Sequence, residues 1–516
     1  MKTKFPFWVS NLIISFCAAV ILGAALTAFS AGQFFPGWLA FGILLWICSF
    51  LLLSVWRAFG SAKALAALMI TAFTIRLVMA VLVSAGLPIW GYDNPVNNAG
   101  FLYSDAYDRD QAAFKLASSD ISLFTVFSSP DKTDQYGGML FLSSAVYRTL
   151  SPDADRPLLI SLLSAFIITL GIGFFWAAVQ KRWPLRIALI ASWLLVLFPD
   201  SVFLGSSQMR EPFLIGFACI ALWAILDWQQ KPLRSALVSI ATLALSCVFS
   251  LPASGIFIAV LAAIVVIEWS LAQKSSLRRG LGFGLLVLVS LAALTAGGMW
   301  LKSTLYYDSY TTSQQSGMIQ AALLIYGDKI MIPFTSLYGL TQPVLAAAIT
   351  DTAAPIWKTI AILQSLSWYC ALPFLLFGLF SAFKANSKES KWLLVLINLV
   401  FLFWVFVSSA RAGGDQWDNP RYRYILLPFM SLLIAWSFDH FQKTHSPWFW
   451  RWVAVIAEFF LLSMKWYLNR YMDFGTKFSI FFTMEIVGIL AVIILGGGLV
   501  WDAVIRHVKK PQVNNG

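Results

Sequence analysis

The stretch LIISFCAAVILGAALTAFS, from Leu12 to Ser30, decides the fold class of this chain. It holds no charged residue and is long enough for one bilayer crossing, which takes roughly 20 mostly apolar residues in a helix. A second such stretch runs from Leu281 to Leu301, and similar stretches recur along almost the whole chain. The sequence therefore predicts a protein built from membrane-spanning helices.

The composition also indicates a lipid environment. Hydrophobic residues make up 59% of the 516 residues and charged residues only 12%, with a mean hydropathy of +0.77, whereas a soluble domain is about 25% charged. We predict an all-α polytopic membrane protein, a single integral membrane domain over residues 1–516, with about 14 transmembrane helices within a range of about 12–14. The expected spans are 9–31, 36–56, 65–87, 157–180, 187–204, 212–228, 235–250, 253–272, 281–301, 357–383, 392–410, 423–439, 450–468 and 480–501.

The distribution of basic residues predicts the orientation. Short, strongly basic loops at 181–186, 231–234, 274–279 and 384–391 alternate with loops that carry more acidic residues. Because short cytoplasmic loops are enriched in Lys and Arg, we expect a multi-pass protein of the cell (inner or plasma) membrane with its N-terminus in the cytoplasm. Topology thus accounts for the net charge of +12, and the expected partner is the lipid bilayer, with no nucleic acid.

Two predicted loops are too long to be simple connectors, and both fall on the non-cytoplasmic side. They cover residues 88–156 and 302–356, and loops of this length usually carry function or folded elements of their own. In the first loop, 106–117 is predicted to be a short helix. The apolar segment 136–150 is too short to span and is predicted to lie in the membrane interface.

The segment from Ser104 to Asp110 is the densest group of ionisable residues in the chain. On a helix, Asp105 and Asp108 share a face because they are three residues apart, while Asp110 turns away. One of these carboxylates is a candidate base. The alternative is a solvated loop in which Ser104 or Asp105 caps the helix.

Three further segments carry candidate arginines. Arg76 falls in the middle of a predicted span, where an unpaired charge costs at least about 2.5 kcal/mol, so it either pairs within the bundle or binds a ligand. Arg210 and Glu211 lie at a hairpin tip and either decorate a helix start or form an ion pair lining a cavity. Arg421 and Arg423 are candidate phosphate ligands, because a guanidinium donates planar, bidentate hydrogen bonds; the alternative is interfacial anchoring.

Standard soluble signatures are absent from the sequence, which has no P-loop, dinucleotide fingerprint, HExxH or CxxC motif. The three histidines fall in predicted cytoplasmic segments, so neither a His-based metal site nor a His-based catalytic triad is predicted on the external side: they are His440, His445 and His507. The five cysteines lie in apolar runs and are predicted to pack within helices: they are Cys17, Cys48, Cys219, Cys247 and Cys370.

The order of these features resembles the class C glycosyltransferases, the polytopic enzymes that use polyprenyl-phosphate-linked sugars, and within them the branch of protein mannosyltransferases and aminoarabinose transferases. The resemblance rests on the order of segments from Arg76 to Pro428: an outward helix, an acidic external loop, an interfacial segment starting near Asp134, and a late Arg-x-Arg before a Pro-containing helix. The chain departs from that pattern because an extra N-terminal hairpin of two predicted helices precedes the outward helix and its acidic loop.

The resemblance implies transfer of a sugar from a polyprenyl-phosphate donor to a lipid, glycan or protein acceptor at the non-cytoplasmic face, with inversion. Asp105 is the first choice of base and Asp108 the second. The expected phosphate ligands are Arg421, Arg423, Arg210 and Lys302. Glu211, Arg76 and Tyr107 are expected to support them. No metal ligand is assigned and no cofactor is required, although a divalent metal ion is left open.

Two other functions remain open at this point. A transporter or flippase of lipid-linked glycans would also have many helices and internal charges, but such proteins usually contain repeated halves around a midplane site, and no clear internal repeat is found. A glycan polymerase or ligase would share the lipid-phosphate chemistry and the external arginines.

Overall fold

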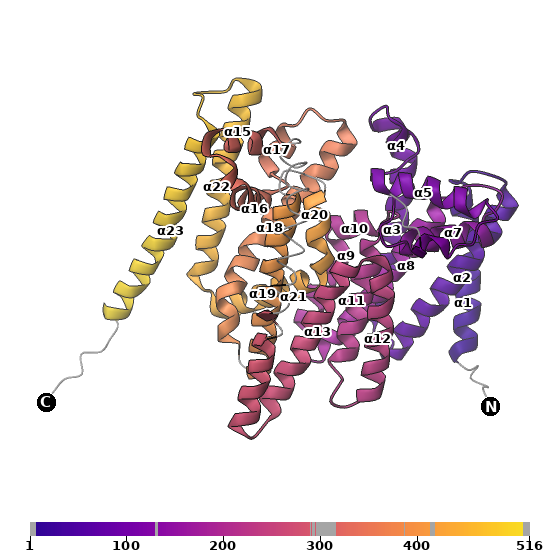
Figure 1. The fold of residues 1–516 in the computed structure, drawn as a ribbon, viewed down its shortest axis with the longest axis horizontal. Coiled ribbons are helices and arrows are strands. Elements are labelled where there is room, and N and C mark those ends of the chain that lie inside the picture. Colours follow the sequence, from indigo (N-terminus) through magenta and orange to yellow (C-terminus); the bar gives the residue numbers. More distant parts are fainter. Residues whose placement is uncertain are drawn as a thin grey trace.

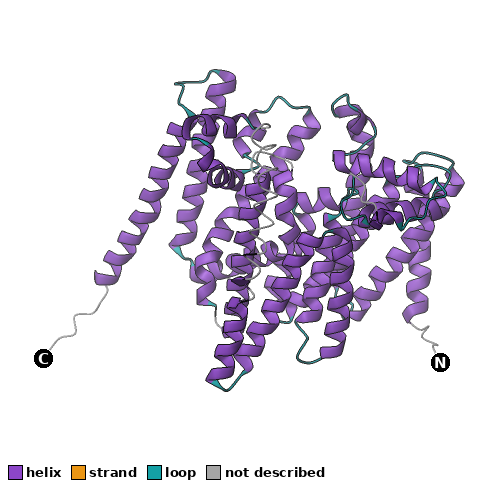
Figure 2. Cartoon of the chain, in the orientation of Figure 1, coloured by secondary structure: helices purple, strands orange, loops and turns teal. Residues whose placement is uncertain are grey.

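The computed structural model describes residues 7–128, 133–288, 290–291, 295, 316–385, 387–412 and 418–508. Throughout these ranges the regular structure is helical, and the described residues form no strand (Figure 2). The all-α prediction is therefore confirmed.

Ten helices in the described part of the chain are long and apolar enough to cross a membrane. Over a run of about 20 apolar residues, a helix pairs its own backbone groups with one another, as the interior of a bilayer requires. The ten are α1 (Phe7–Thr27), α2 (Phe34–Ala58), α3 (Lys63–Trp90), α8 (Leu158–Gln180), α12 (Pro232–Phe249), α13 (Leu251–Ala272), α18 (Pro355–Ser381), α19 (Lys388–Ala412), α21 (Leu427–Thr444) and α23 (Ile480–Val508). The chain is thus a polytopic membrane protein.

Two predicted spans take irregular forms. The span expected at 187–204 is a pair of helices, α9 (Leu185–Leu197) and α10 (Pro199–Gly205), bent by 55°. Pro199 explains the bend, because proline donates no backbone hydrogen bond and clashes with the preceding turn. The span expected at 212–228 is the shorter helix α11 (Glu211–Ile225).

Two others differ in another way. The span expected at 450–468 is the long helix α22 (Pro447–Met472), but it carries Arg451, Glu458 and Lys465 and is less apolar than the other spans. Of the span expected at 281–301, residues 281–288, 290–291 and 295 are described, and these residues are helical.

The interior of the bundle is formed by α8, α9, α11 and α21, whereas α23 stands at its edge (Figure 1). In the most apolar stretch of α8, 78% of the residues are buried inside the protein, against 6% in that of α23. Glycines allow the interior helices to approach closely. A Cβ on Gly216 of α11 would lie 2.6 Å from the carbonyl oxygen of Ile167 in α8.

The first long loop contains helices, as predicted. They are α4 (Pro95–Asn98), α5 (Ser104–Ala117), α6 (Thr125–Ser128) and α7 (Gly138–Leu150). The loop starts later than the expected residue 88, because α3 continues through Pro88 to Trp90. The interfacial location of α7 stays a prediction.

The described part of the second long segment is also helical. It contains α15 (Gly317–Tyr326), η1 (Asp328–Ile330), α16 (Met331–Thr341) and α17 (Leu345–Thr350). Shorter turns of helix occur elsewhere: η2 (Ala382–Lys384), α20 (Asp418–Arg423) and η3 (Tyr424–Leu426).

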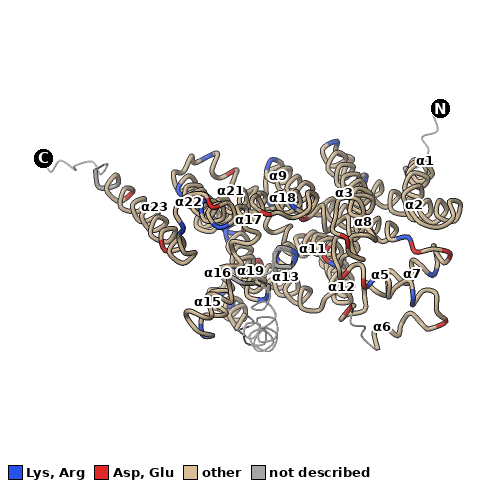
Figure 3. Tube along the Cα trace, turned by 90° about the horizontal axis from the view of Figure 1, so that it is seen from above, with Lys and Arg blue, Asp and Glu red and all other residues tan. Residues whose placement is uncertain are grey.

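The two ends of the bundle differ. One end, here called the loop end, carries α4–α7 and α15–α17 (Figure 1). The other holds the start of α1 and the end of α23 (Figure 1); we call it the basic end because the turns after α8 and α11 carry Lys181, Arg182 and Lys231. Lys, Arg, Asp and Glu occupy few positions along the trace (Figure 3). Ion pairs link these basic turns to one another: Lys181 to Asp227, Arg182 to Glu268, and Arg186 to Asp439.

Candidate functional site at the loop end

Arg421 joins three segments that are far apart in the sequence. Its Nη1 lies 3.0 Å from Oδ2 of Asp105 in α5, which is 316 positions away. Its Nε lies 3.4 Å from Oε1 of Glu211 at the start of α11. The side chains of Arg421 and Glu211 are 5% and 1% exposed, whereas that of Asp105 is 50% exposed. Three residues predicted from separate motifs therefore meet at one place.

Both acids stand in the first turn of a helix. Asp105 belongs to the first turn of α5, and Glu211 opens α11 with Pro212 immediately after it. Proline is tolerated there because the first helical amides have no partner in the helix, and a carboxylate is favoured by the positive end of the helix dipole. The local sequence therefore places each of these two acids at the N-terminal end of its helix.

Tyr422 holds Arg421 in place from the other side. The guanidinium carbons of Arg411 and Arg421 lie 5.3 and 5.1 Å from the centre of the Tyr422 ring, within the range of cation–π attraction. Arg421 also donates to the Tyr422 hydroxyl, with Nη2 to Oη at 3.2 Å. Trp404 of α19 donates its indole N–H to the Tyr422 carbonyl oxygen at 2.8 Å. The turn that presents Arg421 is therefore anchored to a membrane helix.

Arg210 lies beside the start of α7. Its guanidinium carbon is 5.5 Å from the centre of the Tyr136 ring. Asp134 accepts the backbone N–H groups of Met139 and Leu140, each at 2.9 Å. This carboxylate satisfies amides that the first turn of α7 would otherwise leave unpaired.

Arg109 is a member of the site that the sequence analysis missed. It is 5% exposed and donates Nη1 to the Gln208 carbonyl oxygen at 3.0 Å. Burial lowers its pKa, the positive charge of Arg210 acts the same way, and the charges of Asp134, Glu211 and Asp105 oppose them. A signal was present, because Arg109 follows Asp105 by four residues and so shares its helix face.

These residues form what we call the loop-end cluster. Three guanidinium groups and three carboxylates are brought together by α5, α7, α11 and α20, largely away from water. Charges act on one another more strongly in such a place than in bulk water. The cluster is Asp105, Arg109, Asp134, Arg210, Glu211 and Arg421.

Arg76 has its described contacts elsewhere, within the bundle. It is fully buried and donates to the carbonyl oxygens of Ala72 and Leu195 at 2.9 and 3.2 Å, and to Oγ of Ser201 at 2.7 Å. A Cβ on Gly205 would lie 2.6 Å from this side chain. Of the two alternatives for Arg76, the geometry favours pairing within the bundle.

Arg423 turns in a different direction from Arg421. It is fully buried and donates to the carbonyl oxygens of Gln342 and Gly339 at 3.1 and 2.8 Å. Its guanidinium carbon lies 3.8 Å from the ring centre of Trp368. These described contacts join α16 to α18, so a phosphate-binding role for Arg423 stays a prediction without geometric support.

The remaining predicted residues have simpler surroundings. Asp108 is exposed on α5, on the side of the helix that also exposes Asp105, while Asp110 is buried. This matches the expected division of faces. Tyr107 packs its ring against Phe101, with centroids 5.5 Å apart. Lys302 lies outside the described residues.

A small pocket with a cavity volume of about 30 Å³ adjoins the cluster. It lies between α3, α8 and the segment that joins α10 to α11, and its lining includes Ser84, Ala106, Ser161, Ser207 and Gln208. Gln208 also accepts the hydrogen bond from Arg109. In the part of the chain that the structure describes, no group of three or more His, Cys, Asp or Glu residues is arranged to hold a metal ion.

Comparison with known proteins does not assign the chain to a family. No protein-family model matches the chain, and no curated protein matches it. The likeness to class C glycosyltransferases therefore rests on the order of the motifs.

Proposed function

We propose that this protein is a glycosyltransferase that moves a sugar from a polyprenyl-phosphate-linked donor to an acceptor at the non-cytoplasmic face of the cell membrane. The observation that carries the proposal is the junction of Asp105, Arg421 and Glu211. A candidate base and a candidate phosphate ligand, 316 positions apart in the chain, lie within 3.0 Å of each other. They do so at the loop end of the bundle, which is where the proposal places the lipid-anchored substrate.

The junction suits a direct displacement. Donor phosphate oxygens would replace Asp105 as the partner of Arg421, which releases the half-exposed carboxylate to accept the proton of an acceptor hydroxyl. The acceptor oxygen then bonds to the anomeric carbon as the bond from that carbon to the phosphate oxygen breaks. The phosphate leaves with the electron pair, and Arg421 and Arg210 stabilise its charge. One base and one leaving group imply inversion at the anomeric carbon.

Glu211 has a separate part in this scheme. It stays buried against Arg421 when Asp105 is released, so the guanidinium keeps one partner and its orientation. The isoprenoid chain of the donor would dissolve in the bilayer beside the bundle. Such a substrate explains why the catalytic groups would be carried by membrane helices.

The test is a transfer assay with the full-length protein in lipid nanodiscs. The probe is a polyprenyl-phosphate-linked monosaccharide with a radioactive sugar, supplied with a cell-envelope extract as acceptor. We expect wild-type protein to move the label from the donor to the extract. Asp105→Asn should abolish transfer, and Arg421→Lys should lower it at least about tenfold because lysine cannot donate bidentately.

The matched control is Asp120→Asn, an exposed aspartate that follows α5 outside the cluster. It should transfer like wild type. Equal rates for Asp105→Asn and wild type would remove Asp105 as the base. An inactive wild type with donors of several sugars would count against the glycosyltransferase itself. Labelled polymer as the product would favour a polymerase or ligase.

One observation favours the transporter or flippase alternative. Asp200 and Arg423 are buried in the described bundle, and Oδ1 of Asp200 accepts from Gln364 at 2.7 Å. Ionisable residues inside a membrane often mark a transport path. Reconstitution separates the two functions, because a flippase would move the lipid-linked sugar across proteoliposomes without breaking its phosphate bond.

A further inference from the structure

The helix that carries Asp105 also carries a buried carboxyl group that the proposed reaction does not use. Asp110 of α5 is 1% exposed. Its Oδ1 accepts a short hydrogen bond from the hydroxyl of Tyr147 in α7. Its Oδ2 is buried, and the described residues give that atom no hydrogen-bond partner.

A second carboxyl group lies against it. Asp155, in the segment between α7 and α8, is within hydrogen-bonding reach of Asp110. Its Oδ1 is also buried without a partner among the described residues, while its Oδ2 is 3.5 Å from Nε2 of Gln111. Two ionised carboxylates only accept hydrogen bonds. Without a proton between them, these two would repel each other away from water.

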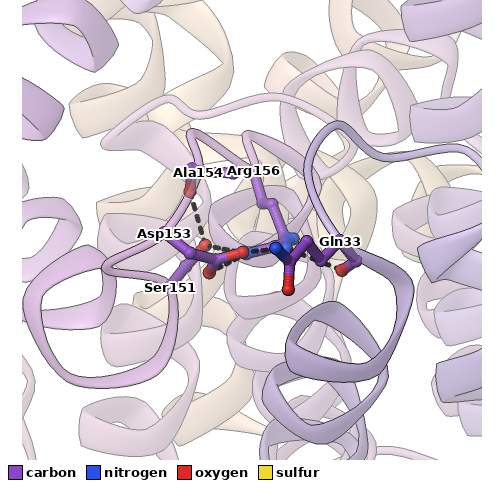
Figure 4. A network of polar contacts seen from close by, with 5 residues as sticks. All are labelled: Gln33, Ser151, Asp153, Ala154 and Arg156. Atoms are coloured by element: carbon purple, nitrogen blue, oxygen red, sulfur yellow. Dashed lines mark hydrogen bonds and ion pairs between the residues drawn. The ribbon is translucent and has the colours of Figure 1, made fainter.

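The segment that bears Asp155 is firmly anchored. Arg156 is fully buried and donates to both carboxylate oxygens of Asp153, each at 2.7 Å, and to the Gln33 carbonyl oxygen at 3.0 Å (Figure 4). It also donates to Oγ of Ser151 at 2.7 Å. This network ties the segment to the α1–α2 turn. The backbone that carries Asp155 is therefore held in place by its neighbours in the segment.

The charged groups of the surrounding elements are engaged elsewhere. Arg148 of α7 donates to the carbonyl oxygens of Leu116, Ala117, Ser119 and Ile121. Arg156 is paired with Asp153, which lowers the pKa of that carboxyl.

Arg109, beside Asp110 in α5, donates to the Gln208 carbonyl oxygen. The groups that act on Asp110 are Asp155, Tyr147 and Gln208. The described residues thus place no cation against the pair.

We infer that Asp110 and Asp155 share one proton, and that this proton holds α5, with Asp105 and Arg109, against α7 and the segment before α8. Asp110 and Asp155 are then positioning residues for Asp105. Their link to sugar transfer rests on the proposed function, whereas the shared proton does not. Burial raises the pKa of both carboxyl groups, and for Asp110 the charge of Asp155 raises it further.

The sign of the pH dependence follows from these directions. A carboxyl whose pKa is higher in the folded than in the unfolded protein stabilises the fold at low pH and loses that effect as pH rises through the folded pKa. The contact of α5 with the Asp155 segment should therefore loosen on the alkaline side. The hydroxyl of Tyr147 lowers the pKa of Asp110, so Tyr147→Phe should move the loosening to higher pH.

The test is a pH titration of the full-length protein in detergent, followed by the infrared band of protonated carboxyl groups. Besides the signal of the buried carboxyl group of Asp200, which all the variants share, wild type should show a band that persists at neutral pH and disappears in alkali. Asp110→Asn and Asp155→Asn should each remove it, because the remaining carboxylate receives a donor from the new amide and ionises. Asp120→Asn should keep the band.

Three outcomes would overturn the inference. They are a wild type without the band, a band that survives in both Asn variants, and a band lost in only one of them, which would assign the proton to a single carboxyl. If an Asn variant fails to fold, Tyr147→Phe still tests the inference. This variant must show the band at neutral pH, and the band must disappear at a higher pH than in wild type.

Backbone hydrogen exchange gives the readout for positioning. After correction for the intrinsic pH effect, exchange of α5 amides in wild type should increase as the band disappears, while in Asp155→Asn it should stay level. If transfer is found, its rate should fall over the same pH range in wild type and not in Asp155→Asn. Absence of transfer in every variant would count against the proposed function and leave the infrared result unaffected.

Discussion

At the scale of single residues, the two acids on Arg421 contribute differently. Glu211 is 1% exposed and Asp105 is 50% exposed. Removing one partner of a buried pair costs about 3–5 kcal/mol because it leaves an uncompensated charge, whereas pairs reached by water contribute about 1 kcal/mol or less. Glu211 is therefore the partner that stabilises the fold, and Asp105 the one that can be exchanged for substrate.

This contrast predicts the stability of two matched variants. Glu211→Gln keeps the shape of the side chain and removes its charge, so it should lower the free energy of unfolding by about 3 kcal/mol. Asp105→Asn should lower it by about 1 kcal/mol or less. Thermal unfolding of both variants in the same detergent makes the comparison. A larger loss in Asp105→Asn than in Glu211→Gln would contradict this division of roles.

The candidate site was only partly visible in the sequence. Asp105, Glu211 and Arg421 stand out because charges are rare in this chain, but their contact depends on how distant helices pack, and no local pattern reveals that. Arg421 and Arg423 look equivalent two positions apart, yet the turn from α20 into η3 points Arg423 at Trp368. Asp110 turns away from Asp105, as expected. No pattern in the sequence, however, predicts that Asp155 lies against Asp110.

At the scale of elements, the central contact is the crossing of α8 and α11. A Cβ on Gly171 would lie 2.7 Å from Cα of Gly216, and one on Gly216 would lie 2.6 Å from the Ile167 carbonyl oxygen. Small residues let helices approach closely in lipid, where dispersion between packed surfaces replaces the hydrophobic effect. Glu211 opens α11, so the way α11 packs on α8 also determines where along the bundle Glu211 meets Arg421.

A single methyl group tests the crossing. Gly216→Ala inserts a Cβ against backbone and should cost about 1–3 kcal/mol of stability through overpacking. Gly42→Ala in α2 is the matched control, because a Cβ there has no atom within 4 Å; it should be neutral or slightly stabilising, since alanine favours helix. Unfolding midpoints of both proteins measure the difference. Equal midpoints would contradict the prediction, because they would mean that α8 and α11 can move apart to admit the methyl group without a loss of stability.

Elements were easier to predict than contacts, for a physical reason. Lipid leaves the backbone only one solution over a long apolar run, so composition predicts α1, α2, α3 and α8 almost directly. The prediction was coarser where another force competes. Pro199 breaks one expected span into α9 and α10. Because α22 carries charged residues, its composition alone does not predict its position in the membrane, which also depends on how it packs against other helices.

At the scale of the whole molecule, charge is sorted between the two ends. Lys181, Arg182 and Arg186 of one turn reach acids on three other segments of the basic end, whereas Arg421 gathers its acids at the loop end. These ion pairs bring the basic turns together at one end of the described bundle. From the positive-inside rule we predict that the basic end faces the cytoplasm.

Cysteine labelling in intact cells tests this orientation. In a protein whose five cysteines are replaced by alanine, Asp120→Cys marks the loop end and Ser275→Cys marks the basic end, both at exposed positions. A membrane-impermeant maleimide should label Asp120→Cys in intact cells and Ser275→Cys only after lysis. The reverse pattern would put the loop-end cluster in the cytoplasm. A sugar donor would then have to be used on that side, and the proposed direction of transfer would be wrong.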